Sequence, residues 1–248
     1  MTERPPVEPF YDGDGVAHSY SRHRHSGPSP NHVMEEPAFL AAVGDLGGLA
    51  VLDLGCGDAH FGLVALQAGA RSYLGVDNSR AMLEQARQVL TGTEAHVQHS
   101  SIEELQLPDG TFDLIVSRMA LHHVEDLDSV LSACRRWVVP SGRVVFTVLH
   151  PVLTSPISVP PSTERRTDWT VDDYFSTGAR QRSWMGSRVT WYHRTLENYV
   201  TSLAANGFAL SQLRECAPEP QRFVDADDPE LARRRRVPMF LLLAAAAT

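Results

Sequence analysis

The residues with the clearest chemical meaning lie between positions 51 and 77. An apolar run ends at Gly55 and Gly57, and a second apolar run ends at Asp77, twenty positions after Gly57. In a β-α-β unit, glycines after the first strand let backbone N–H groups approach a ligand at the start of the helix. An acid at the end of the second strand accepts hydrogen bonds from ribose hydroxyls. The spacing therefore predicts a nucleoside-binding site.

The same turn argues against a dinucleotide as the ligand. The dinucleotide fingerprint G-x-G-x-x-G/A places a small residue at position 60, where this chain has His60. The turn also carries Asp53 and Asp58, whose carboxylates would repel a pyrophosphate. These acids suit a ligand that bears an ammonium and a sulfonium, and S-adenosylmethionine bears both.

Four short motifs follow one another along the chain, at residues 53–57, 75–77, 107–113 and 120–124. Together they resemble the landmarks of class I S-adenosylmethionine-dependent methyltransferases over roughly residues 48–150. The resemblance implies an α/β, Rossmann-like fold, in which helices cover both faces of a mostly parallel seven-stranded sheet. It also implies S-adenosylmethionine as cofactor and S-adenosylhomocysteine as product.

The resemblance extends beyond this core. His150-Pro151 and the segments 192–196 and 238–241 are similar to those of bacterial small-molecule methyltransferases of the type 11 group. The group implies methyl transfer to an oxygen or nitrogen of a small, partly apolar acceptor. Such relatives often have an acid before the His-Pro pair, where this chain has Leu149. We therefore expect no carboxylate at this position to take a direct part in the reaction.

Cofactor-binding residues are expected at the strand ends and in the N-terminal segment. Asp77 should bind the ribose diol, and Tyr20 or Arg22 the methionyl carboxylate. Ser101 occupies the place where relatives carry an acid that binds the adenine amine. The full set expected at the cofactor is Tyr20, Arg22, Asn31, Asp53, Gly55, Cys56, Gly57, Asp77, Asn78, Met82, Ser101, Ile102, Ser117 and Arg118.

An oxygen or nitrogen nucleophile must also lose a proton, and histidine titrates in the useful range. Four histidines lie near expected strand ends or in the insert, namely His122, His123, His150 and His193. The sequence does not indicate which of these four histidines acts as the base. Aligning the methyl group with the attacking atom at about 3 Å supplies roughly 7–11 kcal/mol of the barrier, so proximity alone is the remaining alternative.

The positions of these residues follow from regular alternation between expected strands and helices. Strands are predicted at 50–54, 72–76, 95–98, 112–116, 143–149, 208–213 and 238–244, and helices at 31–43, 60–68, 79–90, 128–138 and 196–206. Alternation implies a parallel sheet, and the resemblance implies a terminal antiparallel pair. The first dozen residues are expected to be loose.

Four segments divide the chain by composition. Residues 1–46 should form N-terminal cap helices and 47–149 the cofactor-binding core. Residues 150–194 are rich in proline and aromatic side chains and are too long for a plain connection. This segment is predicted to be a substrate cap, and 195–248 should complete the core with a helix and a strand pair.

Net charge, cysteine content and the lack of long apolar segments indicate which partners and sites to expect. The chain has 248 residues and a net charge of −8, which argues against a nucleic-acid partner. Its three scattered cysteines give no disulfide framework or zinc site, and no metal is expected. The absence of an apolar leader or span predicts a cytoplasmic protein without a membrane partner. The oligomeric state is left open between monomer and homodimer.

Three other functions compete with methyl transfer. A nicotinamide-dependent reductase is disfavoured by His60 and by the absence of a Tyr-x-x-x-Lys pair. A methyltransferase-like fold that catalyses cyclisation or a lyase reaction with bound S-adenosylmethionine stays open, because fold does not fix function. A non-catalytic partner subunit is poorly supported by an intact cofactor motif.

Overall fold

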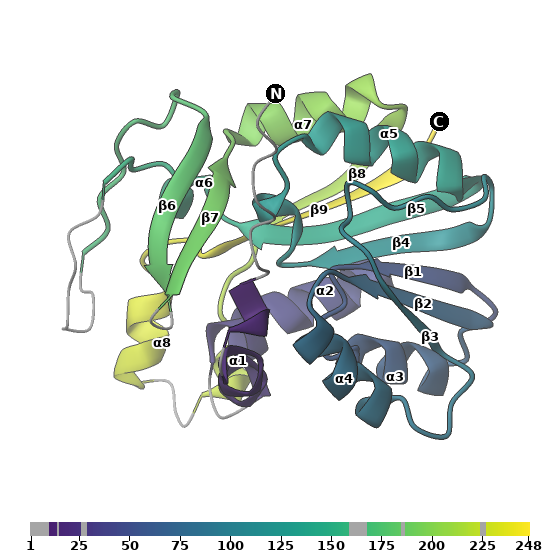
Figure 1. The fold of residues 1–248 in the computed structure, drawn as a ribbon. Coiled ribbons are helices and arrows are strands. Elements are labelled where there is room, and N and C mark those ends of the chain that lie inside the picture. Colours follow the sequence, from purple (N-terminus) through teal and green to yellow (C-terminus); the bar gives the residue numbers. More distant parts are fainter. Residues whose placement is uncertain (1–9, 14, 26–28, 159–167, 185–186, 224–226) are drawn as a thin grey trace, which may run out of the picture.

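The computed structural model describes residues 10–13, 15–25, 29–158, 168–184, 187–223 and 227–248 (Figure 1). A seven-stranded sheet in the order β3-β2-β1-β4-β5-β9-β8 forms its centre. Its strands are β1 (Ala50–Leu54), β2 (Ser72–Asp77), β3 (His96–His99), β4 (Phe112–Arg118), β5 (Val138–Leu149), β8 (Phe208–Glu215) and β9 (Phe240–Ala247). The pairs from β3 to β5 are parallel, and β9 is antiparallel to both β5 and β8. This arrangement confirms the expected fold class and its terminal antiparallel pair.

Helices cover both faces of this sheet (Figure 1). One face carries α5 (Leu127–Trp137) and α7 (Leu196–Ala205). The other carries α2 (Glu36–Val43), α3 (His60–Gln67) and α4 (Arg80–Val89). Alternate strand residues divide between the two layers, since a strand projects successive side chains to opposite faces.

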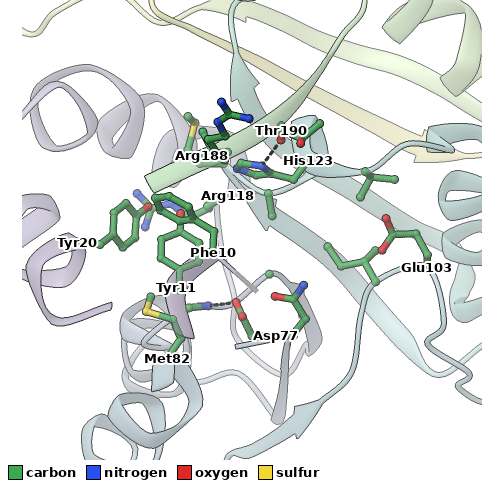
Figure 2. Close-up of a pocket in the computed structure, with 18 residues that line it drawn as sticks. Phe10, Tyr11, Tyr20, Asp77, Met82, Glu103, Arg118, His123, Arg188 and Thr190 are labelled. Atoms are coloured by element: carbon green, nitrogen blue, oxygen red, sulfur yellow. Dashed lines mark hydrogen bonds between the residues drawn. The ribbon is translucent and has the colours of Figure 1, made fainter. Parts of the chain in front are cut away.

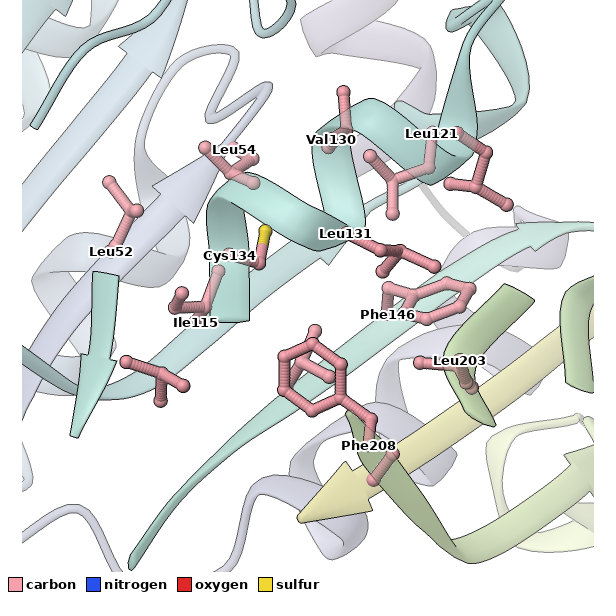
Figure 3. Packing of buried hydrophobic residues seen from close by; sticks show 14 of the residues in the cluster. Leu52, Leu54, Ile115, Leu121, Val130, Leu131, Cys134, Phe146, Leu203 and Phe208 are labelled. Carbon is pink, nitrogen blue, oxygen red and sulfur yellow. The ribbon is translucent and has the colours of Figure 1, made fainter. Parts of the chain in front are cut away.

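The core under α5 and α7 is continuous across the sheet (Figure 3). Leu52 and Ile115 of the strands pack there with Leu131 of α5 and Leu203 of α7, and all four are fully buried. The apolar stripe of α5 faces the sheet, and its start is capped by the Asp126 carboxylate, which accepts from the Ser129 N–H. This packing fixes the carboxyl ends of the parallel strands at one edge, where open α/β sheets bind ligands.

The remaining elements lie beyond the carboxyl edge of the sheet. They are η1 (Phe10–Asp12), α1 (Val16–His25), η2 (Asn31–Glu35), η3 (Leu121–His123), α6 (Pro151–Thr154), β6 (Gly178–Trp184), β7 (Ser187–His193), η4 (Pro220–Arg222) and α8 (Pro229–Arg234). The strands β6 and β7 form a separate antiparallel hairpin. Part of the aromatic insert is therefore a hairpin, which the sequence did not predict.

Two elements differ from expectation. The predicted helix 31–43 is divided into η2, a π-helical turn, and α2, because Glu35 turns inward to pair with Arg118. The fifth strand begins at Val138 rather than at 143. Its register shifts where Phe112 pairs with Val138 and Leu114 with Arg143. The residues between Val138 and Arg143 bulge out of the strand pairing. They include Pro140 and Gly142, which are typical of turns, so the sequence predicts a strand only after them.

No helix in the described ranges is both long and apolar enough to cross a lipid bilayer. The same residues contain no group of three or more His, Cys, Asp or Glu side chains arranged to hold a metal ion.

Candidate functional site

The turn after β1 is built for close backbone approach. Gly55 and Gly57 have φ values of 74° and 56°, in the left-handed region that glycine favours. A Cβ on Gly55 would lie 2.3 Å from the Cβ of Ala120, and one on Gly57 would lie 3.0 Å from Cε of Met82. These glycines leave a cradle that other residue types would fill.

Asp77 joins the two halves of the predicted nucleoside motif. Its carboxylate accepts from the Gly57 N–H at 2.9 Å (Figure 2). It also accepts from the Ser79 N–H at 2.9 Å. Burial raises the pKa of this carboxyl, while those two N–H donors oppose the rise. The side chain is held in one orientation at the end of β2. Each oxygen retains accepting capacity that can serve ribose hydroxyls.

A cavity of about 330 Å³ extends from this turn to the β7 strand (Figure 2). Such a volume lies at the small end of the range for small-molecule sites. Its lining residues are Phe10, Tyr11, Tyr20, Gly55, Gly57, Asp77, Asn78, Met82, Ile102, Glu103, Arg118, Met119, Ala120, His123, Val124, Arg188, Val189 and Thr190.

A smaller cavity adjoins the turn and is lined by Asp53, Cys56, Asp58 and Arg118, among others. Asp53 is buried and accepts from the Tyr73 hydroxyl at 2.7 Å. Burial, together with nearby carboxylates, raises the pKa of the Cys56 thiol well above its usual value. A neutral thiol is a weak nucleophile, so Cys56 serves as a small residue in the turn.

Arg118 links the two cavities and is itself held in a buried network. It donates to both oxygens of Glu35, at 3.0 and 2.6 Å, and Thr147 donates to the same carboxylate at 2.8 Å. Its guanidinium carbon lies 4.7 Å from the centre of the Phe39 ring. The bidentate pair fixes the guanidinium plane, which explains the inward turn of Glu35.

Predicted cofactor residues fall into three groups by position. The main cavity is lined by Tyr20, Gly55, Gly57, Asp77, Asn78, Met82, Ile102 and Arg118, whereas Asp53 and Cys56 line the smaller one. Asn31, Ser101 and Ser117 line neither of these cavities. The backbone of Arg22 lies in α1, and its side chain is outside the described part of the structure.

Hydrogen bonds account for the two serines. The Ser117 hydroxyl donates to the Leu54 carbonyl at 2.7 Å, which ties β4 to β1. The Ser101 hydroxyl donates to the Glu104 carboxylate and accepts from the Glu104 N–H. Both hydroxyls are engaged within the protein. Asn31 begins the π-helical turn and is likewise away from the cavity lining.

Of the four candidate histidines, His123 alone lines the main cavity. Its Nδ1 lies 2.9 Å from the Thr190 carbonyl oxygen. A carbonyl only accepts, so Nδ1 carries the hydrogen and Nε2 keeps a free lone pair. Burial lowers the pKa of this imidazole, although the Thr190 carbonyl partly opposes the effect. His123 is therefore neutral at physiological pH.

The other three histidines have different surroundings. His122 is buried behind His123, with ring centres 4.3 Å apart, and its Nδ1 has no hydrogen-bond partner among the described residues. His150 pairs with Glu215 at 3.0 Å. His193 lies between the Thr154 hydroxyl and the Tyr174 carbonyl. The last two imidazoles use both ring nitrogens internally.

Several cavity residues were not predicted from the sequence. Phe10 and Tyr11 belong to a segment expected to be loose, and Arg188, Val189 and Thr190 to an insert without a predicted shape. Glu103, Met119, Ala120 and Val124 also line the cavity. The one available signal was aromatic density in the insert, because pairing between distant segments leaves no periodic pattern.

Comparisons with known proteins agree with this fold. The family model described as "Methyltransferase domain" matches residues 52–146. An S-adenosylmethionine-dependent methyltransferase from Mesorhizobium loti, known as a crystal structure, is 35% identical with a TM-score of 0.78; the match covers 86% of this chain and 97% of that one.

Two sequence relatives add to this finding. An uncharacterized protein of Haemophilus influenzae is 30% identical over 223 residues, covering 85% of this chain and 88% of that protein. The ubiquinone biosynthesis O-methyltransferase of Alkalilimnicola ehrlichii is 34% identical over 111 residues, 44% of each chain. With the nucleoside cradle and the sheet order, these likenesses assign the chain to the class I S-adenosylmethionine-dependent methyltransferases.

Proposed function

We propose that the protein transfers the methyl group of S-adenosylmethionine to an oxygen or nitrogen of a small, partly apolar molecule. The observation that carries the proposal is one cavity with two chemically different ends. Asp77 and the glycine turn line one end, and the neutral imidazole of His123 lines the other. A nucleoside at the first end would leave the remaining space for a small acceptor.

Different residues of the chain would bind different parts of the cofactor. Asp77 would accept from both ribose hydroxyls, while Asn78 and Met82 would lie beside the adenine. Asp53 would face the methionyl ammonium, and Arg118, already paired with Glu35, would line the methionine end of the site, since each lines the cavity system near Gly55. The bound cofactor supplies an electrophilic methyl group on a sulfonium. The two glycines would bring the backbone close enough to fix its direction toward the acceptor.

His123 would take the acceptor's proton. Its Nδ1–H is occupied by the Thr190 carbonyl, so the basic atom is Nε2. An imidazole with a lowered pKa stays deprotonated at neutral pH and can accept a proton as the acceptor attacks. His150 and His193 do not enter the proposal because their ring nitrogens already have partners.

The region 150–194 would act as the substrate cap. Its β7 strand supplies Arg188, Val189 and Thr190 to the cavity wall, and the Thr190 carbonyl orients His123. The strand that forms part of the cap would thus also orient the base, His123. Enclosure by this hairpin would exclude water from the reacting atoms.

The test is a screen of phenolic and amine acceptors with a labelled methyl donor, in which both the labelled product and S-adenosylhomocysteine are measured. The variant His123→Gln keeps a side-chain N–H for the Thr190 carbonyl but loses the base, so turnover should fall about 10²- to 10⁴-fold. His96→Gln, at an exposed position of β3, is the matched control. Binding of S-adenosylhomocysteine without label transfer to any acceptor would favour a cyclase or lyase. Full turnover in His123→Gln would remove His123 from the mechanism.

A further inference from the structure

Charge is unevenly distributed around the main cavity. Its acidic lining residues, Asp77 and Glu103, are at the cofactor end, and the adjoining cavity adds Asp53 and Asp58. The opposite wall is formed by β7 and contains Arg188. Figure 2 places Arg188 beside His123 and Thr190 and across from Asp77. The acceptor end therefore has positive character.

The two arginines of the lining differ in their partners. Arg118 is buried and neutralised by the bidentate pair with Glu35. Arg188 is exposed at the cavity wall, and it forms no ion pair with any carboxylate within the described ranges. An unmatched cation at a binding cavity favours an anionic ligand. Arg188 can bind both oxygens of a carboxylate with its planar guanidinium.

The position of Arg188 on β7 relates this cation to the base. Arg188 and Thr190 are two residues apart on one strand, so they share a face and lie about 7 Å apart along it. Thr190 holds His123 through its carbonyl. An acceptor that reaches from His123 to Arg188 would therefore carry its reacting group and its anionic group at opposite ends.

The third wall is aromatic. Phe10, Tyr11 and Tyr20 all line the cavity. Phe10 stacks on Trp184 of the hairpin with ring centres 5.3 Å apart, and the ring centres of Tyr11 and Tyr20 are 4.9 Å apart. The rings therefore pack against one another. Aromatic faces and edges give flat ligands extensive contact with little loss of side-chain freedom. The wall suits a planar ring between the cation and the cofactor.

From these observations we infer that the methyl acceptor is a planar aromatic carboxylate. Its carboxylate is bound by Arg188, its ring lies against Phe10 and Tyr11, and its nucleophilic atom faces His123. This inference rests on the proposed methyl transfer. It excludes an acceptor with an ammonium in place of the carboxylate, because that charge would face Arg188.

The test uses three ligands that differ mainly in charge: 4-hydroxybenzoate, 4-hydroxybenzamide and 4-(aminomethyl)phenol. Each is titrated calorimetrically into the full chain saturated with S-adenosylhomocysteine. We expect the carboxylate to bind at least tenfold more tightly than the amide, and the amine to bind most weakly. Arg188→Gln should weaken the carboxylate about tenfold and leave the amide unchanged, whereas Arg214→Gln, on the exposed β8 strand, should change neither.

The inference is overturned by equal affinity for the three ligands, by no detectable binding of any of them, or by an Arg188→Gln variant that still prefers the carboxylate. Affinity for S-adenosylhomocysteine is measured on each protein in parallel. If the unaltered protein fails to bind S-adenosylhomocysteine, the proposed function fails as well. If it binds S-adenosylhomocysteine but shows no charge preference, only the present inference fails.

Discussion

At the scale of single residues, the closest constraint on the cofactor turn is the approach of Gly55 to Ala120. A methyl group on Gly55 would meet the Ala120 Cβ at 2.3 Å, and the backbone there has a φ of 74°. Gly55→Ala therefore adds a clash to a left-handed penalty of roughly 1–2 kcal/mol. We expect it to abolish detectable binding of S-adenosylhomocysteine and to lower the melting temperature, both measurable by a thermal shift.

A double variant separates the two causes. Gly55→Ala with Ala120→Gly removes the atom that clashes but keeps the unfavourable φ. It should recover part of the lost stability and part of the affinity, whereas Ala120→Gly alone should bind nearly as well as the unaltered chain. If the double variant is no better than Gly55→Ala, the Gly55–Ala120 contact does not limit the turn.

At this scale, sequence reasoning located cavity-lining residues where they stand at the ends of predicted strands. Gly55, Gly57 and Asp77 lie at strand ends that a β-α-β pattern locates, and all three line the cavity. It was less informative for Ser101 and Ser117. Their hydroxyls are taken by Glu104 and by the Leu54 carbonyl, and the choice between ligand and protein partner depends on tertiary contacts.

At the scale of elements, the turn η1 holds together two walls of the cavity. Asp12 accepts from the Ser79 hydroxyl at 2.5 Å and from the Arg80 and Ala81 N–H groups at the start of α4. Its neighbour Phe10 stacks on Trp184 of β6. A single turn thus connects the cofactor-binding core to the hairpin, and its residues Phe10 and Tyr11 line the cavity.

Removing this connection should speed release of the cofactor. Asp12→Ala deletes a side-chain cap that usually contributes about 0.5–2 kcal/mol, which corresponds to roughly a 2- to 30-fold change. We expect S-adenosylhomocysteine to dissociate faster by a factor in that range in stopped-flow measurements. Phe10 and Tyr11 would then no longer be held in the cavity wall.

The matched control is Asp126→Ala, which removes the cap of α5 at a site that does not line the cavity. It should lower stability by a similar amount without changing the dissociation rate. Equal effects of the two variants on dissociation would show that η1 does not retain the cofactor.

The elements themselves were predictable to different degrees. Apolar runs located β1, β2, β4 and β9 to within a few residues, because buried strands are near-continuous apolar segments. The strands β3 and β8 are mostly exposed and carry a weaker pattern, and β5 begins at Val138, before the predicted start at 143. The hairpin β6–β7 was missed because its strands mix arginine and other polar residues with aromatics and have no simple apolar face. Arg180, for example, is buried and donates to the Ser155 carbonyl, a pairing that no local pattern indicates.

At the scale of the whole molecule, burial of histidine governs the response to acid. His122, His123, His150 and His193 are largely buried, and burial lowers the pKa of each imidazole. Below the ordinary value of 6.5, the unfolded chain binds protons that the folded chain does not. Stability therefore increases with pH in this range and decreases on acidification.

We accordingly expect the free energy of unfolding in urea to fall between pH 7.5 and pH 5.5, with a slope of at most about 1.4 kcal/mol per pH unit for each histidine. Asp77 acts in the opposite direction, because its raised pKa favours the folded state when it is protonated, but it is one group against four. Activity that depends on neutral His123 should be level above pH 6.5 and decline only in more acidic solution. A stability that stays constant or rises toward pH 5.5 would mean that these imidazoles accept protons in the folded protein as readily as in the unfolded chain.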